Sequence, residues 1–376
     1  MIKLSPVLAG LGTYPFVRLE EARARLRAAG VEIIDFGMGE PREETPRFIR
    51  EALAAAIQPL APYPSAVGLP ELRAAIAGWA GRRFGAALDP DTQVIPTLGS
   101  KEAVFGLAHV FGGDQVVIPQ PAYPVYDRGA RFAGKEIVEL PLREADGWLP
   151  DLGAVDWSRV SILWLNYPNN PTGATAPLEF YAEAAALARR HGFVLASDEA
   201  YSELYFGDEA PRSALELSDL ENVAVLNTLS KRSSMPGYRA GFVAGDPEIV
   251  AALKKYRPNV GVAPPEVLQR AAIAAWNEET HVTEVRARYR TKRELLLPAL
   301  ESMGLRSAGG DASFFLWMRV PDGDDEGLAA RWLEHGVVAA PGSYLGAGGE
   351  GHLRLALVPT VEACERAAEL VARLGT

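Results

Sequence analysis

Between residues 92 and 245 the sequence alternates short apolar runs with stretches of helical spacing, and this alternation limits the possible folds more than any other feature. The apolar runs are "TQVIPT", "DQVVIP", "VSILWLN", "FVLASDEAY", "VAVLNT" and "RAGFVAG". Apolar strands that alternate with amphipathic helices are typical of a largely parallel sheet covered by helices on both faces. We therefore predict an α/β fold.

One of the covering helices can be placed from its ends. The stretch "PLEFYAEAAALARRHG" carries Pro177 at its start and Gly192 at its end. Proline is favoured at the first turn of a helix and glycine just after the last one. We expect the helix to run between these two residues.

The pattern changes after residue 278. A long charged helical stretch, "HVTEVRARYRTKRELLLPALESMG", leads into the strand-like "ASFFLWMRV". The acidic "PDGDDE" that follows is interpreted as a solvated turn and helix start, because acidic residues are favoured at helix N-termini. A chain of 376 residues favours two domains. We predict a large domain over residues 43–278, and a smaller α+β domain made of residues 1–42 and 279–376.

Composition excludes several classes of function. The net charge of −10, from 38 basic and 48 acidic residues, argues against a nucleic-acid surface, which needs clustered positive charge. No apolar run is long enough to span a bilayer, so no membrane association is expected. Prolines and glycines interrupt the first 15 residues, which makes a poor signal peptide. With a single cysteine there is no disulfide framework, and a reducing, cytoplasmic setting is expected.

A metal centre is not expected either. The single cysteine, Cys364, lies in a helical pattern and is interpreted as a small inert side chain. The five histidines show no ligand spacing.

Two strand ends carry residues that suit a bound anion or ligand. In "TLGSKEAVF" a strand ends and a helix begins near Gly99, where exposed N–H groups would suit a phosphate. An ordinary capped helix start explains this stretch equally well. In "LNYPNNPTGA", Asn170 follows a strand at the edge where α/β sheets bind their ligands, although an Asn-Pro turn needs no function.

Charged residues interrupt three other apolar strands or their ends. Asp198 ends the strand of "FVLASDEAYSELYF", and it is either a helix cap or a buried carboxylate that needs a partner. The stretch "NTLSKRSSMPGYRAGFVAG" places Lys231 and Arg239 between two core strands. Arg354 interrupts "GHLRLALV", where it is either salt-bridged or a fork for a carboxylate.

Together these residues match what pyridoxal 5′-phosphate (PLP) requires. A carboxylate such as Asp198 keeps the pyridine nitrogen protonated, so that the ring can accept electrons. An amine such as that of Lys231 stores the aldehyde as a Schiff base. A phosphate dianion needs a cation and helix N–H groups, here Arg239, Ser230 and the turn from Gly99 to Lys101.

The order of these motifs resembles the class I/II aminotransferases of the fold type I PLP superfamily. The similarity runs from "GMGEP" (37–41) through "YPSAVGLPELRAAIAGW", "YPNNPTG", "SDEAY" and Ser-Lys-x(5)-Gly-x-Arg-x-Gly to Arg354. Five matches in the family order cover nearly the whole chain. The resemblance implies a large PLP-binding domain, whose mostly parallel seven-stranded sheet lies between helices, and a smaller α+β domain.

The resemblance also assigns the cofactor contacts. Lys231 would be the Schiff-base lysine and general base, and Asp198 would pair with the ring nitrogen. The other implied contacts are Tyr201 and Asn170 at the ring hydroxyl, Tyr123 stacked on the ring, and the phosphate group of Ser100, Lys101, Ser230 and Arg239.

For the substrate, the resemblance implies that Arg354 forks onto the α-carboxylate, helped by the Gly39 backbone and Asn170. Tyr63 would reach the phosphate of a neighbouring subunit, which implies a homodimer with shared active sites. The bond between Asn170 and Pro171 would be cis. The reaction would be ping-pong transfer between an amino acid and a keto acid, with 2-oxoglutarate and glutamate as the second pair.

Within this family, "SKRSSMPGYRAGFVAGD", "TYPFVRLEEARARL" and "APGSYLG" look most like the succinyldiaminopimelate aminotransferases of bacterial lysine biosynthesis. Arg18, Arg232 and Arg257 are candidates for binding a distal substrate carboxylate, and surface or salt-bridged structural roles explain them as well. Aminotransferases for aspartate, alanine or LL-diaminopimelate are the nearest alternatives.

Three other classes of protein compete with this interpretation. A PLP-dependent C–S lyase would use the same lysine and aspartate. A PLP-fold regulator is disfavoured, since no DNA-binding helical domain is expected before residue 1. A nucleotide-binding dehydrogenase would need a third glycine that "GMGEPR" lacks.

Overall fold

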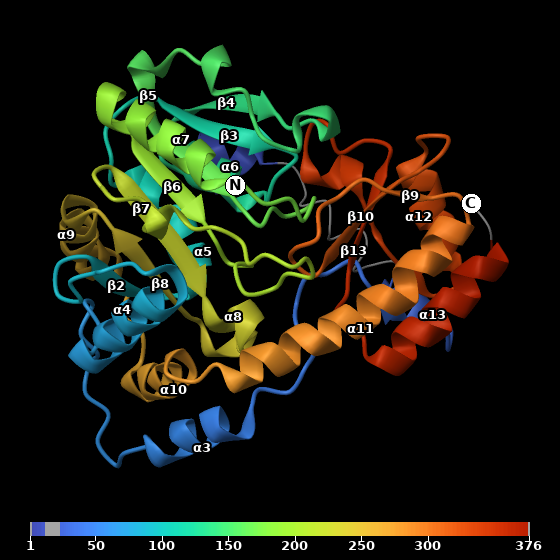
Figure 1. Ribbon diagram of the computed structural model, residues 1–376, viewed down its shortest axis with the longest axis horizontal. Coiled ribbons are helices and arrows are strands. Elements are labelled where there is room, and N and C mark those ends of the chain that lie inside the picture. Colours follow the sequence, from blue (N-terminus) through green and yellow to red (C-terminus); the bar gives the residue numbers. More distant parts are fainter. Residues whose placement is uncertain (1, 12–22, 375–376) are drawn as a thin grey trace.

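The apolar runs form one seven-stranded sheet in the computed structural model, which describes residues 2–11 and 23–374. The strand order is β2-β8-β7-β6-β5-β3-β4 (Figure 1). The strands are β2 (Val94–Leu98), β3 (Gln115–Gln120), β4 (Glu136–Pro141), β5 (Val160–Asn166), β6 (Val194–Asp198), β7 (Val223–Thr228) and β8 (Ala240–Gly245). Only β8 runs antiparallel to its neighbours, β2 and β7. The predicted α/β fold with a mostly parallel sheet is confirmed.

Successive side chains of each strand point to opposite sides of this sheet, so an apolar strand presents an apolar surface on both faces. Helices bury both of these faces. On β5, Ile162 and Trp164 belong to one hydrophobic cluster, while Leu163 and Leu165 belong to another. The first cluster includes α5 (Gly99–Gly106), α6 (Val125–Phe132) and α9 (Pro247–Tyr256). The second includes α3 (Arg47–Ala55), α4 (Pro70–Phe84), α7 (Leu178–His191) and α10 (Glu266–Trp276).

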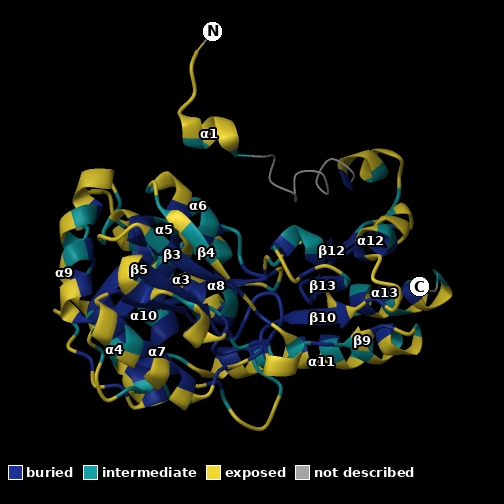
Figure 2. Ribbon diagram, turned by 90° about the horizontal axis from the view of Figure 1, so that it is seen from above, coloured by how far each residue is buried: buried dark blue, intermediate teal, exposed yellow. Residues whose placement is uncertain are grey.

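The smaller part has its own core, built on the four-stranded antiparallel sheet β12-β13-β10-β9. Its strands are β9 (Arg306–Ser307), β10 (Phe315–Arg319), β12 (Ala340–Pro341) and β13 (His352–Ala356), with a parallel pair β1 (Ile34–Asp35) and β11 (Val337–Val338) beside them. Helices α12 (Asp325–Glu334) and α13 (Val361–Leu374) pack on this core. The strands of both parts are largely buried and appear dark blue in Figure 2. The predicted smaller α+β domain is confirmed, whereas the limits 43–278, 1–42 and 279–376 stay a prediction.

The long helix α11 (Thr280–Ser302) joins the two parts (Figure 1). The predicted helix limits also hold elsewhere: Pro177 and Gly192 cap α7, and Gly192 is left-handed. The acidic loop starts α12, because the Asp324 side chain accepts a hydrogen bond from the Gly327 amide. Cys364 is buried in α13, where burial raises the pKa of its thiol to about 12, so it is inert as predicted.

Short elements complete the fold. They are α1 (Pro6–Gly10), α8 (Leu229–Arg232) and the 3-10 turns Leu107–His109, Glu144–Asp146, Leu152–Ala154, Trp157–Arg159, Ala214–Glu216, Pro236–Tyr238, Arg257–Val260 and Gly342–Leu345. Within residues 2–11 and 23–374 no helix is long and apolar enough to cross a bilayer.

Candidate active site

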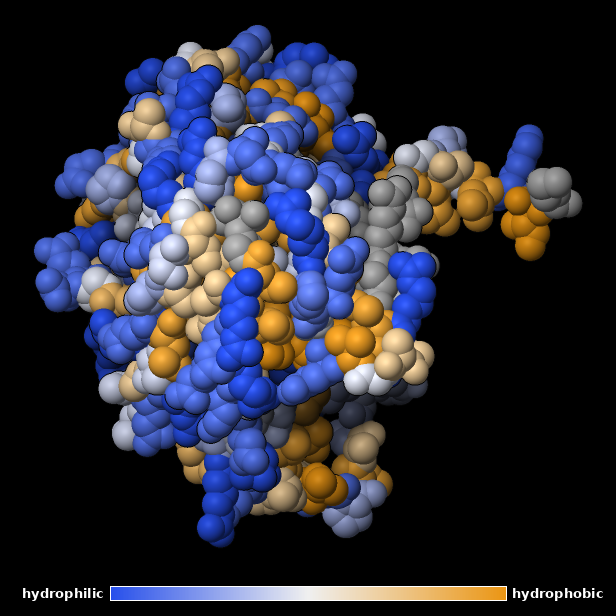
Figure 3. Space-filling view, turned by 90° about the vertical axis from the view of Figure 1, so that its right-hand side faces the viewer, coloured by the Kyte–Doolittle hydropathy of each residue, from blue (hydrophilic) through white to orange (hydrophobic). Residues whose placement is uncertain are grey.

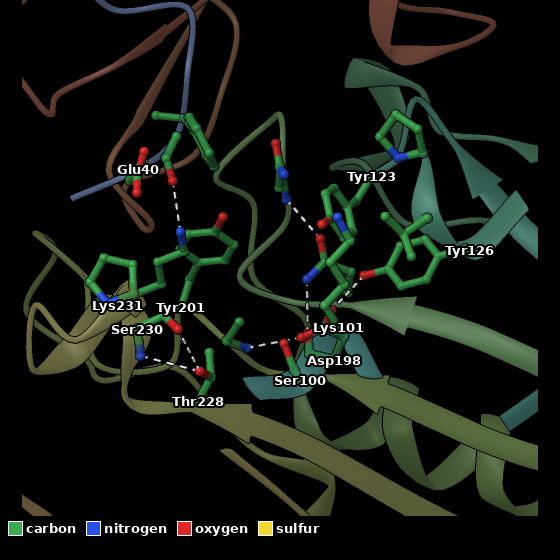
Figure 4. A pocket seen from close by; sticks show the side chains of 18 of the residues that line it. Glu40, Ser100, Lys101, Tyr123, Tyr126, Asp198, Tyr201, Thr228, Ser230 and Lys231 are labelled. Carbon is green, nitrogen blue, oxygen red and sulfur yellow. Dashed lines mark hydrogen bonds between the residues drawn. The ribbon is translucent and has the colours of Figure 1, made fainter. Parts of the chain in front are cut away.

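A pocket of about 810 Å³ opens between the large sheet and the smaller part, at the ends of β5, β6 and β7. Its lining includes eleven of the twelve residues predicted to bind the cofactor or the α-carboxylate, all but Tyr63: Gly39, Ser100, Lys101, Tyr123, Asn170, Asp198, Tyr201, Ser230, Lys231, Arg239 and Arg354. Several of these face one another across the cavity (Figure 4). Residues up to 315 positions apart in the sequence, Gly39 and Arg354, thus meet at one site.

Lys231 is held in place by the short helix α8, which follows β7 directly. The Thr228 side chain caps this helix by accepting a hydrogen bond from the Ser230 amide. The Lys231 Nζ donates to the Gly39 carbonyl oxygen at 2.7 Å. Burial lowers the pKa of the Lys231 amine to about 8, and the nearby Glu40 carboxylate opposes this shift. A pKa this low leaves an appreciable fraction of the amine neutral near neutral pH, as a nucleophile or a general base requires.

Asp198 is a buried carboxylate at the end of β6 with neutral hydrogen-bond donors. Its Oδ2 accepts from the Tyr126 hydroxyl at 2.8 Å and its Oδ1 from the Ala200 amide at 3.2 Å. Burial raises the pKa of Asp198 to about 6, although these donors and Lys231 lower it. Residues 199–203 form turns rather than an α-helix, so the alternative of a helix cap is wrong. A protonated pyridine nitrogen would supply the cation that this carboxylate lacks.

The start of α5 and Arg239 form a cradle for an anion. No side chain caps the first turn of α5, where the Ser100 and Lys101 amides lie. Arg239 lies beside it, with Nη2 donating to the Leu98 carbonyl at 3.0 Å. Gly99 has a φ of +67°, and a Cβ there would lie 2.5 Å from Arg239 Nη2. Uncapped amides and a guanidinium around a space that only glycine allows fit a phosphate group.

Arg354 enters the pocket from β13 of the smaller part. Its Nη1 donates to Asn170 Oδ1 at 3.0 Å, and its Nη2 donates to the Gly37 carbonyl at 2.7 Å. The guanidinium carbon lies 4.5 Å from the centre of the Phe315 ring. Asn170 is itself positioned by Asn166, whose Oδ1 accepts from the Asn170 amide. The expected cis bond between Asn170 and Pro171 is present.

The remaining predicted residues divide into those inside the pocket and one outside it. Tyr123 and Tyr201 line the cavity, and the Tyr201 ring packs edge-on against Phe314 and Phe315. Tyr63 is fully exposed between α3 and α4 and lies outside the pocket. A site formed within one chain therefore does not include it.

The candidates for a distal carboxylate are not in the pocket. Arg232 is buried, pairs with Glu279 at 2.8 Å, and packs against the rings of Trp79 and Trp276. Arg257 is buried and pairs with Glu102. Both side chains thus form structural ion pairs, which is the alternative role that the sequence left open for them. Arg18 lies outside the described residues.

Sequence reasoning missed Tyr126, which contacts Asp198 directly and stacks on Trp164. It stands three positions after Tyr123 in "PAYPVY". That spacing puts both side chains near one face of a helix turn, which was a usable signal. The lining also includes two exposed or partly exposed charged residues, Glu40 and Arg128, to which the sequence analysis assigned no role.

Comparison with known proteins shows the family to which the chain is related. Residues 31–371 match the family model described as aminotransferase class I and II. An LL-diaminopimelate aminotransferase of Aquifex aeolicus is 40% identical over the full length of both chains. An aminotransferase crystal structure from Neisseria meningitidis is 36% identical, with a TM-score of 0.92 over 99% of this chain and 100% of that one. A Thermus thermophilus structure described as a probable N-succinyldiaminopimelate aminotransferase is 34% identical, with a TM-score of 0.86 over 96% of this chain and 99% of that one.

Proposed function

This chain belongs to the class I and II aminotransferases, a PLP-dependent family, and we propose that it transfers the amino group between a diaminopimelate-type amino acid and 2-oxoglutarate. The family membership makes the protein a PLP-dependent aminotransferase that acts on amino acids and keto acids. Curated relatives that are 38% and 40% identical over 99% and 100% of this chain are named LL-diaminopimelate aminotransferases, and this observation carries the substrate proposal.

LL-diaminopimelate is therefore our first candidate for the amino donor, and it replaces the N-succinyl form that the sequence motifs favoured. The N-succinyl compound stays the second candidate because of the Thermus thermophilus structure. Either donor would place the protein in diaminopimelate and lysine biosynthesis. The cytoplasmic setting expected from the sequence stays a prediction.

When bound, PLP supplies a protonated ring that accepts the electron pair released as the substrate loses its α-proton. In our proposal Asp198 keeps the ring nitrogen protonated, and Tyr123 packs on the ring face. Tyr201 and Asn170 donate hydrogen bonds to the ring hydroxyl. Ser100, Lys101, Ser230 and Arg239 hold the phosphate, as the uncapped start of α5 suggests.

Arg354 and Lys231 would orient the substrate and move its proton. Arg354 presents a guanidinium edge to the α-carboxylate, with Asn170 and the backbone near Gly39 fixing its position. The Lys231 Nζ then accepts the α-proton and returns it on the cofactor side. Its lowered pKa, about 8, suits a group that must take and give a proton near neutral pH.

We also propose a homodimer in which Tyr63 of each subunit completes the other subunit's phosphate site. Ile57, Leu60 and Tyr63 stand exposed on one segment between α3 and α4. Large exposed apolar side chains gathered on one segment indicate an interaction surface. A second apolar segment, residues 2–11, projects from the rest of the chain and exposes Ile2 and Leu4 (Figure 3).

The test is a comparison of amino donors at saturating 2-oxoglutarate. LL-diaminopimelate, its N-succinyl derivative, aspartate, alanine and cystathionine are offered one at a time, and kcat/KM is measured through glutamate formation. We expect the highest value for LL-diaminopimelate, with parallel-line ping-pong kinetics. A higher value for aspartate or alanine refutes the substrate proposal but leaves the family assignment intact. Release of pyruvate, ammonia and homocysteine from cystathionine without a keto acid would instead indicate a C–S lyase.

A further inference from the structure

The pocket holds more positive charge than the proposed reaction has used. Its lining contains five cationic side chains: Lys101, Arg128, Lys231, Arg239 and Arg354. Lys231 serves as the amine, Arg239 faces the phosphate, and Arg354 takes the substrate α-carboxylate. The side chains of Lys101, whose backbone amide faces the phosphate, and of Arg128 have no role in the proposed reaction. Of the two, only the Arg128 guanidinium can bind a carboxylate through two parallel hydrogen bonds.

Arg128 lines the pocket and, among the residues that the structure describes, keeps two of its donor nitrogens without a partner. Its Nη1 donates to Asp127 Oδ2 at 3.0 Å, and the same carboxylate accepts a bond from Arg131 Nε. Within the described residues Nε and Nη2 of Arg128 have no hydrogen-bond acceptor. The side chain is 29% exposed, so it is partly desolvated but still reachable from the pocket.

Arg128 belongs to the wall of the pocket that the large sheet and its helices supply. It lies on α6, which starts directly after Tyr123 and Pro124 and carries Tyr126. Figure 4 places Tyr123 and Tyr126 on the side of the cavity opposite Lys231 and Glu40. The neighbouring helix α5 adds Lys101 and Phe105 to this wall. Arg354 comes from β13 in the smaller part, so the guanidinium groups of Arg128 and Arg354 reach the cavity from the two different parts of the fold.

We propose that Arg128 binds the second carboxylate of the substrate and thereby selects dicarboxylic amino acids. This inference rests on the proposed function, because both diaminopimelate donors and glutamate carry a carboxylate beyond the one that Arg354 takes. Asp127, held between Arg128 and Arg131, fixes the guanidinium so that less rotational freedom is lost on binding. Arg232 and Arg257 are almost fully buried and lie outside the pocket, whereas Arg128 lines it and is partly exposed.

The experiment compares Arg128→Gln with Arg131→Gln. Arg131 lies on the same helix and pairs with the same Asp127, but it does not line the pocket, so its variant controls for the loss of that ion pair. For donors with two carboxylates we expect kcat/KM of R128Q to fall roughly tenfold to a hundredfold, as for the loss of a partly exposed charge-assisted hydrogen bond. For alanine, which has one carboxylate, both variants should match the wild type.

A binding readout separates this inference from the proposed function. Glutarate, adipate and pimelate, with acetate and butyrate as monocarboxylates, are titrated by calorimetry into the PLP-loaded protein. Weaker binding of the dicarboxylates alone by R128Q supports the inference, even if LL-diaminopimelate proves not to be the donor. Equal losses for alanine and dicarboxylates, or R128Q behaving as R131Q does, overturns it, even if LL-diaminopimelate is the preferred donor. Arg128→Lys, which keeps the charge but not the fork, should recover part of the affinity.

Discussion

Replacing Asp198 by asparagine should make the cofactor-free protein more stable at alkaline pH while disabling the reaction. Burial raises the pKa of this carboxyl from an ordinary 3.8 to about 6. A carboxyl whose pKa is raised on folding costs no stability at low pH, where it is protonated in both the folded and the unfolded state. As the pH rises from about 4 to about 6, the unfolded state ionises more readily than the folded state, and the folded state loses stability. The ionised Asp198 should therefore destabilise the cofactor-free fold above that range.

The magnitude follows from the size of the shift. About two pKa units correspond to a cost of roughly 3 kcal/mol at pH 8, and of roughly 2 kcal/mol at pH 5, where the carboxyl is mostly protonated in the folded state only. Asparagine is neutral at both values. The free energy of unfolding of D198N should thus gain roughly 1 kcal/mol on the wild type between pH 5 and pH 8.

Urea unfolding of both cofactor-free proteins at the two pH values measures this difference. The comparison is between pH values, so the bonds that asparagine changes at Tyr126 and Ala200 cancel. With PLP bound, the ring cation should remove the penalty in the wild type, and kcat of D198N should fall by about a hundredfold or more. A difference in unfolding free energy that does not change with pH would mean that Asp198 titrates normally, and the electrostatic reasoning would be refuted.

Three further predictions concern neighbouring residues. Glu40→Gln should lower the pKa of Lys231 below about 8, because the Glu40 carboxylate raises it; the pH dependence of amine modification in the cofactor-free protein measures this, with Glu44→Gln, outside the pocket, as the control. Gly99→Ala should weaken PLP affinity tenfold or more, by about 1.4 kcal/mol or more, because the new Cβ displaces Arg239. The control is Gly192→Ala, at a glycine that also has a positive φ but has nothing near its Cβ. This variant should lower stability but leave PLP titrations unchanged. Mixing inactive Tyr63→Ala and Lys231→Ala proteins should restore roughly a quarter of the wild-type activity, because half of randomly paired dimers hold one intact site; no recovery after confirmed subunit exchange would refute shared sites.

The sequence was sufficient to predict the features that follow from local pattern. Asp198 and Asn170 follow apolar strands, and parallel strands bring their ends to one edge, so both could be placed at the pocket. Lys231 and Arg239 were placed by the strands on either side of them. The small domain was recognised from its change of pattern, and Arg354 from the charge inside an apolar strand.

What could not be predicted depends on contacts between distant segments. Arg232 follows Lys231 in the sequence, yet its guanidinium packs against the rings of Trp79 and Trp276. No spacing in the sequence predicts these contacts. Arg128 lies in a helix rich in charge, "VYDRGARF", where only the fold distinguishes the arginine at the pocket from Arg131 at the surface. The role of Tyr63 could not be derived from local pattern either, because its predicted contact is with a second chain.

Chemical trapping of the cofactor tests the central role given to Lys231 most directly. The PLP-loaded protein is reduced with borohydride, digested, and analysed by peptide mass spectrometry, with Lys231→Ala treated in parallel. We predict that the reduced cofactor is found on the peptide that contains Lys231, and that the variant carries none. Reduced cofactor on another lysine, or no covalent cofactor in a protein that still transfers amino groups, would contradict the account.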